Sequence, residues 1–169
     1  MIKKLKQLFM QKFMCKGFFQ IQFFDADTGK LLKQTKIIEN TLTEVNRQYR
    51  QAMLDGTYGT QGLNISDLEI MYFAVGDGTT ASSVSDTQLE NERERVAVTA
   101  LSSSGTDTTS VTVFSPQVAN FRIREIGVFC GSSATSTANS GIMISRINVD
   151  FTKTANITMN VNRIDRTVI

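Results

Sequence analysis

Short segments in which apolar and polar residues alternate, each bounded by turn-forming residues, recur along most of this 169-residue chain. In the segment 156–162, for example, Ile157, Met159 and Val161 alternate with polar residues. Side chains point to opposite faces of a β-strand in turn, so this period of two predicts a half-buried strand. A chain made of such segments can bury one face of each strand by packing two sheets together.

Further segments with strand character are 18–24, 30–38, 68–75, 95–101, 110–114, 121–129 and 141–150. Short strands at modest spacing, separated by turn-rich stretches, are typical of antiparallel all-β domains. We therefore predict a mainly β fold, a small antiparallel β-sandwich over residues 17–162 with one inserted helix. The residues expected in its core are Ile70, Tyr72, Phe73, Ile123, Ile126, Val128, Ile144, Ile157 and Met159.

Turns and loops should connect these strands. Residues 25–29 are predicted to turn the first two strands into a hairpin, and residues 102–105 to join the strands on either side of them. Residues 76–92 are predicted to form a long surface loop. The small polar residues of 132–140 predict a flexible connection that contributes nothing to the core.

One helix is predicted between the hairpin and the later strands. With Thr41 as N-cap, Glu44 occupies the third helical position and completes a capping box. The helix is expected to run to about Leu54 and to end at Gly56.

The first sixteen residues, which we call the leader, combine lysines with apolar side chains. A helix over residues 1–16 would place Ile2, Leu5, Phe9 and Phe13 on one face. Lysines interrupt the apolar residues, which excludes a secretory signal. The leader could dock on a partner, lie on a membrane surface or lie on its own domain, and docking on a partner is the hypothesis we favour.

Charge is distributed unevenly between the leader and the rest of the chain. The leader's five lysines all precede the first acidic residue, Asp25, and without them the formal net charge of +2 becomes −3. A duplex-DNA-binding domain usually carries basic residues across a folded face. We therefore expect no nucleic-acid partner, and no membrane partner either, because no apolar run approaches the roughly 18 residues of a membrane span.

The last residues, 163–169, are predicted to form an extended tail. We expect this tail and the leader to reach onto neighbouring subunits. The interface candidates are Ile2, Leu5, Phe9, Phe13, Arg163, Ile164 and Arg166.

The chain contains no histidine, which excludes a Ser-His-Asp triad, a Cys-His pair and a His-ligated zinc site. Cys15 and Cys130 are far apart in sequence and are interpreted as two buried or inert thiols. We predict no enzymatic activity, no cofactor and no metal site.

Several short motifs are better explained by backbone geometry than by chemistry. Residues 27–29 spell the Asp-Thr-Gly of aspartic proteases, but charged neighbours favour an exposed hairpin tip. Residues 25–36 lack the glycine position and closing glutamate of a calcium loop. Residues 76–80 lack the lysine of a phosphate-binding loop. The alternating charges of 90–95 are typical of a solvated or interchain face.

A larger pattern is carried by three segments. Residues 74–79, AVGDGT, follow an apolar strand, residues 86–92 read DTQLENE, and residues 123–129 read IREIGVF. This series resembles the N-terminal module of bacteriophage tail-fibre and tail-collar proteins. In that module a buried strand ends in A-x-G-x-G-T, a loop carries D-T-x-L-x-N-E, and a later strand reads I-R-E-I-G-L-F. The resemblance covers about residues 18–161.

The resemblance implies a structural role in the virion, located in the tail, baseplate or collar and assembled in the host bacterial cytoplasm. The implied partners are further copies of the chain, as a homo-oligomer, and other virion proteins. Fibre proteins continue into a shaft and a receptor-binding tip, whereas this chain ends at Ile169 and begins with a lysine-rich leader. We therefore expect a stand-alone relative, such as a fibre adaptor.

Other functions remain as alternatives. A receptor- or carbohydrate-binding module could use the same sandwich, although the chain has no Trp and three Tyr to serve as aromatic platforms. A capsid decoration protein is a further alternative. A nucleic-acid binder ranks below these, because only the leader is basic.

Overall fold

The computed structural model describes residues 14–57 and 64–168. It is mainly β, with two antiparallel sheets and one α-helix, which confirms the predicted small sandwich with an inserted helix. The strands are β1 (Met14–Asp25), β2 (Leu31–Gln34), β3 (Ile38–Glu39), β4 (Thr41–Leu42), β5 (Ile70–Gly76), β6 (Glu92–Ala97), β7 (Ala100–Ser104), β8 (Asp107–Phe114), β9 (Arg122–Cys130), β10 (Ile142–Thr152) and β11 (Ile157–Val168). The helix is α2 (Glu44–Asp55), and a 3₁₀ turn, η1, covers Ile65–Leu68.

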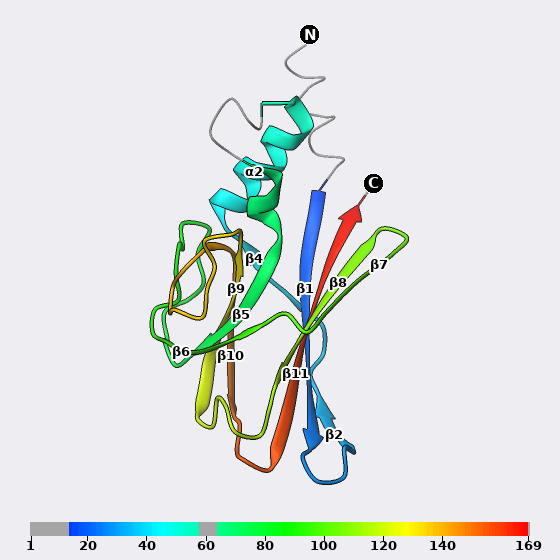
Figure 1. Ribbon diagram of the computed structural model, residues 1–169, viewed down its shortest axis with the longest axis vertical. Helices are drawn as coiled ribbons and strands as arrows, with labels where there is room; N and C mark the ends of the chain where they lie inside the picture. The colour runs from blue at the N-terminus through cyan, green and yellow to red at the C-terminus, as the bar shows by residue number, and fades with distance from the viewer. Residues whose placement is uncertain (1–13, 58–63, 169) are drawn as a thin grey trace.

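The two sheets form the two layers of the sandwich (Figure 1). The first, which we call sheet A, has the order β2-β1-β11-β8-β7, and β3 also pairs with β1. The second, sheet B, has the order β4-β10-β9-β5-β6. Helix α2 lies at the end of the sandwich where β1 begins and β11 ends. The first and last long strands, β1 and β11, therefore lie side by side at the centre of sheet A.

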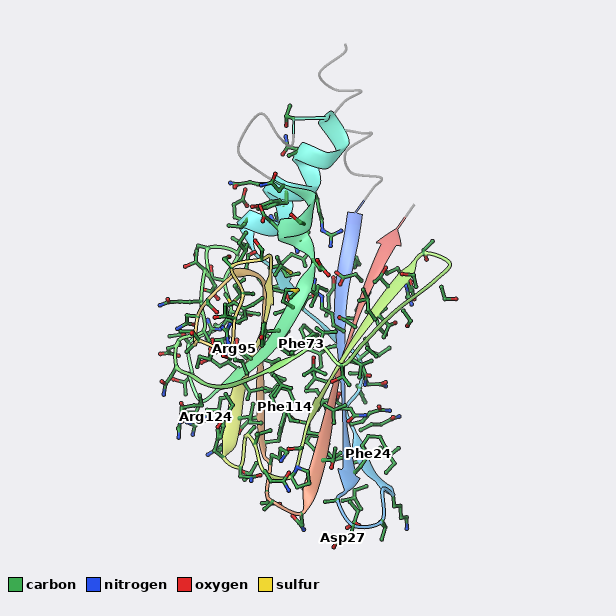
Figure 2. The ribbon with its side chains drawn as sticks, viewed as in Figure 1. Phe24, Asp27, Phe73, Arg95, Phe114 and Arg124 are labelled. Carbon is green, nitrogen blue, oxygen red and sulfur yellow. The ribbon has the colours of Figure 1, made fainter. Side chains whose placement is uncertain are left out.

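The core lies between the sheets and follows the alternation of the sequence. Figure 2 shows Phe73 and Phe114 pointing into this space from opposite sheets. The ring of Phe19 meets that of Phe73 edge to face, with centroids 6.1 Å apart. Of the predicted core residues, the following are buried: Phe73, Ile123, Ile126, Val128, Ile144 and Met159. Ile70 and Ile157 pack partly buried against this core.

Tyr72 differs from the other predicted core residues, because it packs on the opposite face of sheet B. Of the two cysteines predicted to be buried or inert, Cys130 is buried, and burial raises the pKa of its thiol to about 12. Among the described residues, no helix has the length and apolar character that crossing a membrane requires.

The predicted strand 95–101 is wrong, because the chain changes sheets within it. The Val98 amide donates to the Met71 carbonyl on β5, whereas the Thr99 amide donates to the Val111 carbonyl on β8. Two consecutive residues thus bond to different sheets, and β6 and β7 are separate strands. Hydropathy could not locate this crossing, since the residues on both sides of it are similarly apolar.

The predicted start of the helix is displaced by two residues. Thr43, not Thr41, is the N-cap: its hydroxyl accepts from the Asn46 amide and donates to the Met143 carbonyl. Thr41 instead belongs to β4, which pairs with β10. Gly56 ends the helix as predicted, in the left-handed conformation with φ of 74°.

Both predicted terminal boundaries are wrong where the structure describes them. Residues 14–16 begin β1 and pair with the end of β11, so a leader helix cannot extend to residue 16. Residues 163–168 are not a separate tail, because β11 continues through them between β1 and β8. The period of two predicted for 156–162 therefore continues at least to Arg163, which is buried like Val161.

The Asp-Thr-Gly motif lies at the tip of the β1–β2 hairpin, where Figure 2 shows Asp27. The Asp25 carboxylate accepts hydrogen bonds from the backbone amide and the hydroxyl of Thr28, at 2.8 and 2.6 Å. These bonds lower the pKa of Asp25 below its ordinary value. The residues of the motif thus form the predicted turn.

Candidate functional site

Two loops cover the outer face of sheet B, the face turned away from sheet A. They are residues 77–91, between β5 and β6, and residues 131–141, between β9 and β10. A second apolar cluster is buried beneath them and consists of Ala74, Leu89, Phe129, Ala134 and Met143. We call this region the loop-covered face. Each of the three segments that carry the phage-module resemblance contributes residues to it, while Val75, Ile126 and Val128 of these segments face the core between the sheets.

Glu125 is the centre of this face. It is a fully buried carboxylate on the otherwise largely apolar strand β9. Its oxygens accept from the backbone amides of Gly78, Glu90 and Asn91, at 3.1, 3.0 and 2.8 Å. One side chain thus accepts hydrogen bonds from backbone amides at both ends of the 77–91 loop. A buried carboxylate needs such donors, because an unpaired buried charge is strongly destabilising.

Arg146 on β10 supplies the opposite charge. Its guanidinium is almost fully buried, and its Nη2 lies 2.9 Å from a Glu125 carboxylate oxygen. Nη1 donates to Asp86 at 2.8 Å, and Nη2 donates to the Thr80 carbonyl at 3.1 Å. The pair therefore fastens the middle of the loop as well as its ends.

The glycines of the motif are explained by the close approach of the 77–91 loop and of Glu125 to their backbones. A Cβ on Gly76 would collide with the Asn91 carbonyl oxygen. One on Gly78 would lie 2.5 Å from a Glu125 carboxylate oxygen, and one on Gly127 would lie 2.9 Å from a methyl of the buried Leu89. Each glycine is thus required by what packs above it rather than by its own backbone conformation.

We expect Gly76→Ala to lower the free energy of unfolding by about 1–3 kcal/mol, because the added methyl meets a backbone atom that cannot rotate away. Gly29→Ala is the comparison for backbone strain without a steric clash, since nothing lies within 4 Å of its Cβ position but its φ of 66° disfavours a side chain. Chemical denaturation measures both variants. A loss at Gly76 below about 0.5 kcal/mol would contradict the packing explanation.

A second ion pair fastens the 131–141 loop. The Arg95 and Glu92 side chains are 3% and 1% exposed, and Nη2 donates to the carboxylate at 2.8 Å. Arg95 also donates to the carbonyls of Thr135 and Ser140, and its guanidinium lies 4.4 Å from the centre of the Phe129 ring. These contacts correct two predictions, one for the charged run 90–95 and one for the loop between β9 and β10.

The charged run 90–95 is not wholly a solvated or interchain face, because two of its residues form this buried pair; Arg93 and Glu94 are exposed. The 131–141 loop is not a connection without core residues either, since Ala134 is buried in the second apolar cluster. In both cases a local polar composition concealed contacts that are distant in sequence.

The carboxylates of the loop-covered face are engaged in holding backbone and guanidinium groups. Glu90 illustrates this: Thr80 donates to it from its amide and its hydroxyl, at 2.8 and 2.9 Å. These two bonds lower the pKa of Glu90. Within the described ranges, no group of three or more Cys, Asp and Glu residues is arranged to hold a metal ion. The hydrogen bonds and ion pairs of this arrangement hold the 77–91 and 131–141 loops against sheet B.

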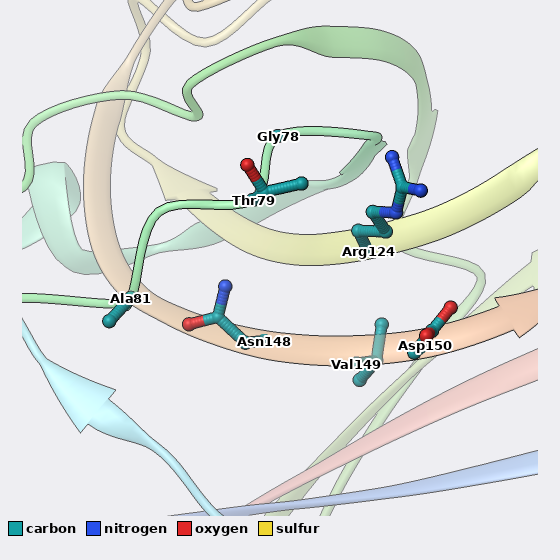
Figure 3. A pocket seen from close by; sticks show the side chains of 7 residues that line it. All are labelled: Gly78, Thr79, Ala81, Arg124, Asn148, Val149 and Asp150. Carbon is teal, nitrogen blue, oxygen red and sulfur yellow. The ribbon is translucent and has the colours of Figure 1, made fainter.

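A shallow depression lies at the edge of this face, with a volume of about 410 Å³. Figure 3 shows the loop passing over β9, which supplies Arg124, and β10, which supplies Asn148 and Asp150. Asn148 is already engaged, since it accepts from the Ser82 amide and donates to the Thr80 carbonyl. Asp150 pairs with Arg122 at 2.7 Å. The lining residues are Gly78, Thr79, Ala81, Arg124, Asn148, Val149 and Asp150.

The predicted interface residues are dispersed. Ile2, Leu5, Phe9 and Phe13 lie outside the described residues. Arg163 is fully buried between the sheets, so its predicted place at a subunit interface is wrong.

Ile164 and Arg166 do lie together, on the outer face of sheet A. Ile164 is half-buried and stands opposite Phe18 of β1. Arg166 is exposed, pairs with Asp107 at 2.7 Å and lies 5.7 Å from the Phe18 ring. Successive side chains of a strand point to opposite faces, so Arg163 points between the sheets while Ile164 and Arg166 point to the outer face of sheet A.

Sequence reasoning missed the two residues that organise the loop-covered face, Glu125 and Arg146. A signal was present: each is a charged residue within an apolar strand, and the two signs are opposite. A charged side chain on the buried face of an apolar strand needs an oppositely charged partner, and the neighbouring strand offers one.

The three motif segments, separate in sequence, thus meet at one pair of buried charges. Comparisons of the chain with protein-family models, with curated proteins and with solved structures find no match.

Proposed function

We propose that the chain is a structural protein of a bacteriophage virion, in the tail, baseplate or collar, and that it acts by docking to neighbouring subunits. The observation that carries the proposal is the use of the motif residues. Gly76, Leu89 and Glu125 pack or pair within the loop-covered face, and the apolar motif residues on the other face of sheet B, such as Val75 and Ile126, pack in the core between the sheets. Residues that hold loops and sheets in a fixed arrangement, rather than contact a substrate, are what a structural module needs.

The outer face of sheet A supports the proposal from another direction. It combines half-buried apolar side chains with amides and has no second layer over it among the described residues. Members of this face on the three central strands are Phe18, Gln20, Gln22, Phe24, Val111, Val113, Asn160, Asn162 and Ile164. Such a mixed surface is typical of non-obligate protein interfaces.

The direct test is detection of the chain in purified phage particles by mass spectrometry. Its presence at a fixed ratio to a known tail protein would support the proposal. Absence from particles that contain their complete tails would overturn it.

Residues 1–13 of the leader are the part that we expect to dock, and a shortened chain tests this. Because β1 begins at Met14, a variant that starts there keeps the whole sheet. We expect this variant to fold with an unchanged denaturation midpoint and to be excluded from particles. Leucine and phenylalanine side chains left exposed in the leader would each forgo about 1.5–3 kcal/mol of burial, which docking recovers.

A matched variant that replaces only Phe9 and Phe13 by serine separates the apolar anchors from the lysines. Normal incorporation of the chain that starts at Met14 would contradict docking by the leader. Failure of that chain to fold would assign the leader to the domain's own core.

A second candidate is a receptor- or carbohydrate-binding module, and the depression beside Arg124 is the observation that favours it. No aromatic side chain lines this depression. Glycan binding by the isolated chain that is lost in Arg124→Ala would favour this candidate over the first.

A further inference from the structure

Strand β7 forms an open edge of sheet A. It pairs with β8 on one side only, and all five of its residues are exposed, Leu101 to 61%. In Figure 1 it forms the outer side of the β7–β8 hairpin, which projects from the sandwich beside the end of β11. Alternate N–H and C=O groups of an edge strand point away from its sheet and are free to pair with another strand.

The other edges carry features that discourage such pairing. Strand β6 has four charged residues in succession, and β4 is two residues long. On the far edge of sheet A, β2 contains Lys33, and its pairing with β1 is irregular between Phe23 and Phe24. Charges, short strands and irregular pairing are the usual protections of an edge.

Strand β7 has none of these protections. It contains no charged residue and no proline, and its pairing with β8 runs without a register shift. The uncharged stretch extends from Val96 to Thr106. Among the described edge strands, β7 is therefore the one suited to strand addition.

We propose that β7 pairs with β7 of a second copy of this chain, antiparallel about a two-fold axis. The inference rests on the proposed function and specifies the partner for its self-association. A two-fold axis places each residue near its own counterpart, so a charged edge would repel itself, whereas the 96–106 stretch meets no like charge. The register centred on Ser102 pairs all five residues of the strand.

Self-association through this edge should be weak in solution. Five residues form few hydrogen bonds, and the contact is well below the roughly 1,600 Å² of a standard stable interface. The pairing would therefore be populated at high protein concentration or where an assembly holds two copies close together.

Sedimentation of the intact chain over a range of concentrations tests the pairing. We expect a monomer–dimer equilibrium that Leu101→Lys weakens by about tenfold or more, since it sets two ammonium groups near the axis. Leu32→Lys on the β2 edge is the matched control, because Leu32 is similarly exposed at 54%. We expect this control to leave the equilibrium unchanged, and denaturation midpoints verify that both variants fold.

Cysteine cross-linking tests the geometry independently. In a Cys15→Ser background, Ser102→Cys is expected to form a disulfide-linked dimer, because opposed Cα atoms of antiparallel strands lie about 4.5–5.5 Å apart. Leu101→Cys and Ser103→Cys report the neighbouring registers. Cross-linking at any of these three positions supports the pairing, and cross-linking at none of them overturns it.

The remaining outcomes separate this inference from the proposed function. A dimer that Leu101→Lys does not affect overturns pairing at β7 and leaves self-association standing. If the chain is a monomer at every concentration, the proposal that a second copy pairs with β7 is wrong. In that case, exclusion of Leu101→Lys alone from particles would assign β7 to another virion protein. Protection of the β7 amides that point away from β8, if it is lost in the chain that starts at Met14, would assign the edge to residues 1–13 of the same chain.

Discussion

Truncation of Arg163 to alanine is expected to lower the free energy of unfolding by about 4 kcal/mol. Arg163 is fully buried, with two nitrogens donating to the Asp165 carboxylate at 2.8 Å and Nη1 donating to the Ser145 hydroxyl at 2.7 Å. The bond to Ser145 joins β11 of sheet A to β10 of sheet B, whereas the bonds to Asp165 stay within β11. Removing the guanidinium deprives the mostly buried Asp165 carboxylate, 13% exposed, of its two shortest charged hydrogen bonds, leaves Arg50 3.4 Å from it and opens a cavity.

Arg166→Ala is the matched control on the same strand. Arg166 also pairs with an aspartate, Asp107, but its side chain is 50% exposed, so its loss should cost less than about 1 kcal/mol. Urea denaturation of both variants gives the comparison. Equal and small losses would mean that the end of β11 behaves as the separate tail that the sequence predicted.

Replacement of Glu125 by glutamine is expected to cost about 3 kcal/mol. The amide keeps the size of the side chain but removes the charge that faces Arg146, and its NH₂ group cannot accept from the backbone amides of the 77–91 loop. We also expect the backbone amides of the loop to lose protection from hydrogen exchange. Hydrogen exchange at Gly78 and Asn91 should therefore accelerate more than exchange within the central strands.

Asp150→Asn makes the corresponding acid-to-amide change in an exposed ion pair. Asp150 and Arg122 are 59% and 55% exposed, so the expected loss is below about 1 kcal/mol. A Glu125→Gln variant as stable as Asp150→Asn, with unchanged exchange in the loop, would show that the buried pair does not hold the loop in place.

The sequence alone determined where most strands lie and which of their faces are buried. Met159 and Val161 are buried as the alternation predicts, and the turn after Asp25 forms a hairpin. Gly56 ends the helix where a residue free to adopt positive φ was expected. These features are local: a period of two or a turn-forming cluster fixes them within a few residues.

The tertiary structure decided the features that depend on distant partners. Consecutive residues Val98 and Thr99 join different sheets because one finds its hydrogen-bond acceptor on β5 and the other on β8. Arg163 is buried because the same alternation continues into a strand lined on both sides by others. The Glu125 side chain is accommodated within an apolar strand because Arg146 and a loop more than thirty residues away supply its partners. A sequence pattern records the polarity of a residue, but the cost of burying its charge depends on which groups the fold brings to it.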